Sequence, residues 1–294
     1  MPLVRAVAWI VGSALVVAIG GHLFLQQAIS TQRAKLHDPK YRITRIVQTG
    51  PQKEALSTFC LAEIIGLSSD QPIPLSRFNS EEAEFRLAAC PVIEKAHIEV
   101  EKPHTVYIDY YTRQPVAWLY DYVNIGLDDK ACAFPVTPFF SPKNLPEIYL
   151  GLFAQHPPPQ PLVWNQPLQD ERLKLALSIL RLFSTKEYSG LFTLQRVDVS
   201  SAFAESCGGR QVVLMIEETC RKNMGERNLL LSQPLFLRLS AKNISQELGN
   251  YLSLRQKIWD TIEVAKLAAS DKEREVILPA RVIDLRIEGL AFIQ

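Results

Sequence analysis

The sequence lacks an excess of charge of either sign. Its 294 residues include 32 Lys and Arg against 31 Asp and Glu, which gives a formal net charge of +1. Proteins that bind nucleic acid or an anionic membrane surface through charge usually carry a basic patch or a clear positive excess. The basic residues are also not interleaved with aromatics on one face, as is typical of single-strand binding. The composition therefore argues against a nucleic-acid partner.

The short motifs of nucleotide binding and hydrolysis are also absent. The sequence contains no G-x-G-x-x-G or Walker A loop, no G-x-S-x-G elbow and no H-E-x-x-H. The acidic pair Asp128-Asp129 is isolated, which is typical of a solvated turn. The five histidines are scattered and none stands at a zinc-ligand spacing: His22, His37, His97, His104 and His156. We expect no catalytic residue, no metal, no cofactor and no small-molecule substrate, and therefore a function in binding.

Cysteines are few and odd in number, and none forms a C-x-x-C pair. Two pairs are candidates for a disulfide in an oxidising compartment. Cys207 and Cys220 flank a predicted hairpin, and Cys60 and Cys90 lie on two neighbouring short helices. The alternative, which the sequence favours, is that all five thiols, Cys132 included, are buried and pack as small hydrophobic groups.

Charged residues are missing from one long stretch near the start. Ala6–Ile29 reads AVAWIVGSALVVAIGGHLFLQQAI and has no Asp, Glu, Lys or Arg as far as Leu25. About twenty apolar residues span a bilayer core as a helix. A cleaved signal peptide, the main alternative, has a shorter apolar run and an A-x-A cleavage site. The stretch predicts a transmembrane helix over residues 6–29, between a short tail (1–5) and a polar tether (30–40).

The charges that flank this helix leave its orientation open. Arg5 precedes it, and the positive-inside rule taken alone keeps the more basic following side in the cytoplasm. Long folded domains, however, cross the membrane despite flanking charge. The basic residues that follow the helix are Arg33, Lys35, Lys40, Arg42 and Arg45.

Residues 41–111 alternate between strand and helix patterns. Two stretches with a period of two, on either side of Lys102-Pro103-His104, predict a half-buried strand pair. Before them Asn79, followed by Glu82, is a capping-box-like helix start. The predicted order is strand (41–49), helix (56–65), helix (80–89), strand (96–101) and strand (105–111). This order predicts a small α+β module with one sheet.

The remaining residues predict a strand-rich domain with flanking helices. A final strand often lies at the edge of a sheet, and an edge accepts a strand from a partner. The alternative is a last strand that the fold covers. The predicted strands are 118–123, 194–199, 211–216, 234–239 and 276–287; the helices are 168–183 and 244–269; a turn covers 123–135 and a proline-rich loop 138–167.

Several spaced motifs occur in chain order across these elements. They are Ile43-x-x-Ile46-Val47-x-x-Gly50, Leu87-x-x-Cys90-Pro91-x-Ile93-x-x-Ala96, Val100-x-x-Pro103-x-x-Val106, Arg113-x-Pro115-Val116-Ala117-Trp118, Leu127-Asp128 and Ile283-Asp284-Leu285-Arg286.

With the apolar stretch before them, these motifs resemble the bacterial cell-division proteins FtsQ or DivIB. The resemblance implies a transmembrane helix, a POTRA module (β-α-α-β-β, residues 41–113) and a mixed β domain with flanking helices (114–294). Two features depart from the family: Gly126 precedes the aspartate of the Leu127-Asp128 turn, and the helical stretch Trp259–Ala269 is longer than the family needs.

The resemblance also implies a function. Family members are non-enzymatic divisome scaffolds of the inner membrane at the division septum, with a cytoplasmic N-terminus and an extracytoplasmic bulk. They recruit division proteins and bind the FtsB/FtsL pair, which adds a strand beside the last strands of the β domain. By this resemblance, the partner is expected to contact Arg286, Ile287, Gly289 and Phe292. The polar face of the predicted hairpin is a candidate second docking surface, formed by His97, Glu99, Tyr107 and Asp109.

Two other functions remain open at this point. One is a POTRA-type chaperone or adaptor in protein export or envelope assembly, which normally carries several such modules or a β-barrel. The other is an anchored hydrolase that uses Cys207 as a nucleophile, for which the spacing suggests no nearby base.

Overall fold

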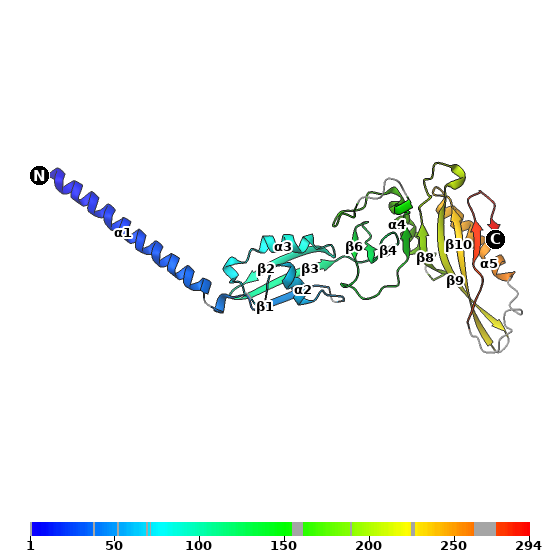
Figure 1. Cartoon of the computed structure of the whole chain (residues 1–294), viewed down its shortest axis with the longest axis horizontal. Helices are drawn as coiled ribbons and strands as arrows, with labels where there is room; N and C mark the ends of the chain where they lie inside the picture. Colours follow the sequence, from blue (N-terminus) through cyan, green and yellow to red (C-terminus); the bar gives the residue numbers. More distant parts are fainter. Residues whose placement is uncertain are drawn as a thin grey trace. The chain divides into compact units, whose positions relative to one another are not determined.

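A computed structural model describes residues 2–37, 39–51, 53–68, 70, 72–154, 161–188, 190–224, 227–261 and 275–294. The chain divides into two compact units, unit 1 (Met1–Thr112) and unit 2 (Arg113–Gln294). Both combine helices with sheets, so the fold is mixed α+β as predicted (Figure 1).

Unit 1 begins with one continuous helix, α1 (Pro2–His37), drawn in blue in Figure 1. This helix contains the predicted transmembrane stretch 6–29 and most of the predicted tether, which is therefore helical as far as His37. A short 3-10 helix, η1 (Pro39–Tyr41), follows it. Within the described residues, no helix meets the length and apolarity needed to cross a membrane.

The rest of unit 1 has the predicted order strand, helix, helix, strand, strand. Its sheet has the order β1-β3-β2, with β1 parallel and β2 antiparallel to the central β3. Its elements are β1 (Arg45–Thr49), α2 (Thr58–Ile64), η2 (Leu75–Arg77), α3 (Ser80–Ala89), β2 (Ile93–Glu101) and β3 (Thr105–Thr112).

Local signals in the sequence explain where these elements begin. Asn79 caps α3 as predicted, because its side-chain oxygen accepts the backbone N–H groups of Glu81 and Glu82 at 3.1 and 3.3 Å. Ser57 caps α2 in the same way. Alternate residues of β3 then point into a core shared with the helices, formed by Leu61, Ala83, Leu87, Ile98, Val106, Ile108 and Tyr110.

Unit 2 is built on one ten-stranded mixed sheet. Its strand order is β13-β12-β10-β9-β8-β7-β4-β5-β6, and β11 pairs with β10 beside this path. The strands are β4 (Ala117–Leu119), β5 (Ile125–Leu127), β6 (Ala133–Pro135), β7 (Glu147–Tyr149), β8 (Phe192–Asp198), β9 (Val212–Met224), β10 (Arg227–Leu239), β11 (Glu275–Ile277), β12 (Arg281–Asp284) and β13 (Phe292–Ile293).

Helices α4 (Glu171–Phe183) and α5 (Ile244–Asp260) join this sheet in one hydrophobic core. Alternate strand residues supply the sheet side of the core, as the period of a strand requires. Two short 3-10 helices, η3 (Leu152–Ala154) and η4 (Cys207–Gly209), lie in the connections. The core includes Leu119, Ile148, Val197, Leu214 and Leu237 from the strands, and Leu173, Leu177, Leu248 and Tyr251 from the helices.

Several predicted boundaries in unit 2 are wrong. The predicted strand 118–123 ends at Leu119, and the predicted turn 123–135 holds β5 and β6. The predicted proline-rich loop holds β7, which lies inside the sheet between β4 and β8. The predicted strand 276–287 is two strands, because the register with β10 shifts around Pro279: Ile277 lies opposite Ser232, but Arg281 lies opposite Leu235. The helix predicted over 244–269 is described only as far as Asp260, so most of the stretch Trp259–Ala269 lies outside the described residues.

Candidate functional site

The candidate site is the edge of the unit 2 sheet at β13. Val282 and Gln294 exchange two backbone hydrogen bonds at 3.1 and 2.9 Å, and Ile293 lies opposite Ile283. Along two antiparallel strands, residues that bond the partner strand alternate with residues whose N–H and C=O point away from it. The backbone of Ile293 therefore faces away from β12, and no strand of the described chain pairs with that side.

A tight turn brings the chain back to form this edge. The Leu290 N–H donates to the Ile287 carbonyl at 3.1 Å, and Gly289, at the third position of the turn, has φ +71°. A positive φ at this position alone is the signature of a type II turn and favours glycine. Nothing lies within 4 Å of the place where a Cβ would stand on Gly289, so its conformation and not its surroundings selects glycine.

This turn gives a prediction about stability. We expect Gly289→Ala to lower the free energy of unfolding by about 1 kcal/mol, because an alanine at positive φ is strained. Gly249, inside α5, also has open space around it but ordinary helical geometry. Gly249→Ala should instead raise stability by about 0.5–1 kcal/mol. Urea unfolding of the full chain measures both changes in stability, and equal effects of the two variants would contradict the strained conformation assigned to Gly289 in the turn.

Large apolar side chains are exposed along the turn and the edge strand. The exposed fractions are 54% for Ile287, 56% for Leu290, 52% for Phe292 and 49% for Ile293. Large apolar side chains that are exposed together at one sheet edge of a folded domain often mark an interaction site. Since Phe292 and Ile293 are consecutive in a strand, they point to opposite faces of the sheet, and a strand added here would meet apolar side chains on both faces.

A groove of about 750 Å³ lies beside this edge and shares Ile287 and Phe292 with it. Its remaining lining mixes apolar groups with cations. Phe203 and Ala241 belong to the apolar part, while Arg210 and Lys242 are cationic. The groove therefore continues the apolar surface of the edge and adds positive charge to it.

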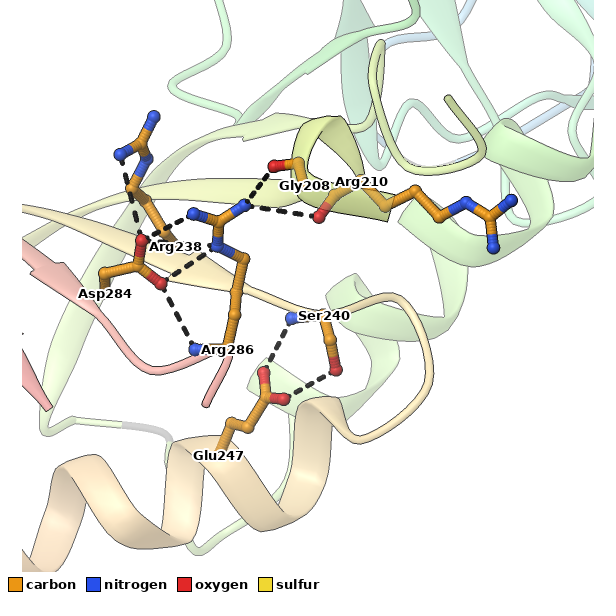
Figure 2. Close-up of polar contacts among 7 residues, drawn as sticks. All are labelled: Gly208, Arg210, Arg238, Ser240, Glu247, Asp284 and Arg286. Atoms are coloured by element: carbon orange, nitrogen blue, oxygen red, sulfur yellow. Dashed lines mark hydrogen bonds and ion pairs between the residues drawn. The ribbon is translucent and has the colours of Figure 1, made fainter. Parts of the chain in front are cut away.

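An ion pair holds the end of β12 against the wall of the groove (Figure 2). The Arg286 guanidinium donates from Nε and Nη2 to the Asp284 carboxylate at 2.9 and 2.7 Å. Its Nη1 donates to the Gly208 carbonyl at 3.0 Å, which ties β12 to η4. These hydrogen bonds from Arg286 hold the pKa of Asp284 below its usual value. Arg286, predicted as a partner contact, is thus engaged within the chain.

A contact between Ser240 and Glu247 fixes the part of the groove that Ser240 lines. Glu247, in the first turn of α5, accepts the Ser240 backbone N–H at 2.7 Å and the Ser240 hydroxyl at 2.5 Å (Figure 2). Arg210 donates its Nε to the Ala204 carbonyl at 2.7 Å, and its side chain extends away from Arg286 (Figure 2). Arg210, Ser240 and Arg286, which line the groove, therefore already have partners within the chain.

The predicted second docking surface lies in unit 1, on one face of the β2–β3 hairpin. His97 lies opposite Asp109, and Glu99 lies opposite Tyr107. His97 Nδ1 is 2.7 Å from the Glu84 carboxylate of α3.

The same Glu84 oxygen accepts the Ile98 backbone N–H at 2.6 Å. Because β2 is an edge strand of its sheet, this carboxylate occupies a backbone donor of the edge. The four predicted residues are therefore brought together, beside a sheet edge that α3 partly covers.

The sequence left a disulfide between Cys207 and Cys220 open and favoured five buried thiols, and the structure fits neither, since only Cys132 is buried. All five cysteines are free, with Cys207 exposed in η4 and Cys220 half-buried in β9. Cys207 precedes the start of β9 at Val212, and the eight residues from there to Cys220 span about 26 Å of extended strand. A disulfide needs Cα atoms within about 7 Å. The sequence suggested a short hairpin at this place, and the strand is longer than that.

The solvated role predicted for Asp128 is also wrong. Asp128 and Arg113 are both buried and form an ion pair at 2.8 Å. The other Asp128 oxygen accepts the backbone N–H groups of Lys130 and Cys132 at 3.0 and 2.8 Å. The two motifs Arg113-x-Pro115 and Leu127-Asp128, noted separately in the sequence, therefore meet in one buried contact.

Comparison with known proteins gives no further guide: no protein-family model matches the chain, and no curated protein matches it.

Proposed function

We propose that this chain is a non-enzymatic scaffold of the bacterial divisome that binds a partner protein by strand addition at β13. The observation that carries the proposal is the open, apolar edge of the ten-stranded sheet. Main-chain hydrogen bonds to an added strand give affinity, and side chains on both faces give selectivity.

The predicted contact residues have different roles in this proposal. Ile287 and Phe292 provide exposed apolar surface between the edge and the groove. Gly289 sets the turn that places β13 beside β12. Arg286 holds the end of β12 through Asp284 and η4, and an acidic partner residue would compete for its guanidinium.

The partner that we propose is an FtsB/FtsL-like pair of division proteins. This part of the proposal comes from the motif resemblance and from the element order of unit 1, β-α-α-β-β, which is that of a POTRA module. The hairpin face with His97, Glu99, Tyr107 and Asp109 is proposed as a second docking surface for another membrane protein of the septum.

The location that we propose is the inner membrane, with a single anchor at residues 6–29, a cytoplasmic N-terminus and an extracytoplasmic bulk. Its support is the run of residues 6–25, which contains no Asp, Glu, Lys or Arg and is long enough for a membrane-spanning helix. The folded part that follows is large enough to override the flanking basic residues.

The experiment that tests this function is the position of the chain in dividing cells. We expect a fluorescent fusion of the full chain to concentrate at the division septum, and affinity purification to recover division proteins. Even labelling of the whole membrane would contradict the proposal. Recovery of export or envelope-assembly proteins would favour the alternative, a POTRA-type chaperone or adaptor.

A further inference from the structure

Two thiols of unit 1 come from helices that the sheet brings to the same place. Cys60 lies in the first turn of α2, where its backbone N–H donates to the capping Ser57 hydroxyl at 3.2 Å. Helix α2 follows β1, whose last residue, Thr49, lies opposite Asp109 of β3. Just before α2, the Leu56 N–H donates to the Tyr110 hydroxyl at 2.8 Å. Cys60 is therefore held near the end of β3.

Cys90 also lies near this end of β3, between the end of α3 and the start of β2. It is the C-cap of α3, where its N–H donates to the Leu87 carbonyl at 3.0 Å. Its carbonyl accepts the N–H of Ile93, the first residue of β2, at 3.1 Å. Ile93 lies opposite Thr112, the last residue of β3. Both cysteines thus flank the stretch from Tyr110 to Thr112.

Helices α2 and α3 pack against each other, and burial raises the pKa of the thiol that each contributes. Burial raises the pKa of Cys90, and the nearby Cys60 adds to the rise. Burial also raises the pKa of Cys60. Both residues are half-buried, so reagents reach them, whereas the other cysteines, Cys132, Cys207 and Cys220, all belong to unit 2.

We propose that Cys60 and Cys90 form an intramolecular disulfide that joins α2 to the end of α3. In this step the two thiols lose two protons and two electrons, and a bond forms between their sulfur atoms. A protein or small-molecule disulfide accepts the electrons and is reduced to two thiols by thiol–disulfide exchange. Formation of the bond in cells rests on the extracytoplasmic location proposed above, because the cytoplasm keeps thiols reduced.

The bond would restrict the unfolded chain more than the folded one. It closes a loop over residues 60–90, which holds the connection from α2 to α3, and closing such a loop lowers the entropy of the unfolded state. We expect the melting temperature of unit 1 to rise by on the order of 10 °C when the bond forms.

The test uses the purified full chain, reduced and then treated with oxidised glutathione. Peptide mapping without reduction should recover the Cys60 peptide joined to the Cys90 peptide, in the monomer. Cys60→Ser and Cys90→Ser should each abolish the joined peptides and the rise in melting temperature, while Cys207→Ser should keep both. Because burial disfavours both thiolates, the rate of bond formation should rise steeply from pH 7 to pH 9.

Two outcomes overturn the proposal: both thiols stay alkylatable after oxidation, or they join to unit 2 cysteines or to other copies. A bond that forms in the purified chain but not in cells would leave the pairing intact. That result would instead count against the extracytoplasmic location.

Discussion

Replacement of Ile293 by proline is expected to weaken partner binding by on the order of 100-fold or more. The Ile293 N–H faces away from β12, so proline removes a donor that only an added strand would use. Its ring also stands where the partner backbone must approach. The partner acceptor left without its hydrogen bond costs about 1–3 kcal/mol and the ring adds a steric clash, so a total of about 3 kcal/mol corresponds to this change in affinity.

The matched control is Ile293→Ala, which keeps the N–H and shortens the side chain. We expect it to weaken binding by only about tenfold, through lost apolar contact. Titration calorimetry with the extracytoplasmic segment of an FtsB-like partner measures both affinities. Neither substitution touches the bonds between Val282 and Gln294, so unfolding curves should stay close to that of the original chain. A proline variant that binds as well as the alanine variant would exclude strand addition at β13.

Asp128→Ala is expected to destabilise unit 2 by about 3–5 kcal/mol, the usual cost of removing one member of a buried ion pair. The Arg113 and Asp128 side chains are only 7% and 6% exposed, so the guanidinium would lose its counter-charge without gaining water. The N–H groups of Lys130 and Cys132 would also lose their acceptor.

Urea unfolding of the full chain, followed through the unit 2 transition, measures this loss. Gln195→Ala is the control, because the exposed Gln195 amide also bonds a carboxylate, that of Glu217, at 3.2 Å. It should change stability by no more than about 0.5 kcal/mol. The double variant Asp128→Asn with Arg113→Met should recover part of the loss, since it removes the uncompensated charge. Equal effects of Asp128→Ala and Gln195→Ala would contradict the role of the buried pair.

The order of elements in unit 1 could be predicted because its signals are local. Strands β2 and β3 are long enough to show alternation, and Asn79 is followed at once by the helix that it caps. The register of the hairpin then follows from its short connection. Each of these features lies within a few residues of the element that it defines.

Unit 2 was harder to predict because several of its strands have only three residues. In β7, Glu147-Ile148-Tyr149 stands among prolines and is too short to show a period of two. It becomes a strand through parallel pairing with β4 and β8, which are far from it in the sequence. Such contacts leave no local pattern, and so the segment looked like a loop.

The candidate site could be predicted only in part for a similar reason. The sequence indicates a strand at the end of the chain and a glycine within it. It does not show that the chain reverses at Gly289, or that Asp284 and η4 already hold Arg286. The η4 contact joins residues 78 positions apart, so no sequence spacing points to it.

If residues 6–29 anchor the chain in a membrane, as we propose, the bond from the Ile98 N–H of the edge strand β2 to the Glu84 carboxylate of α3 has a consequence for crowding there. Copies of an anchored protein meet one another in two dimensions, at a far higher local concentration than in solution. An uncovered strand edge on each copy would let identical modules join side by side before any partner arrived. By occupying the Ile98 N–H, Glu84 makes this self-pairing less favourable on unit 1. Copies packed together at a septum would then stay separate, and β13 would remain available to the partner.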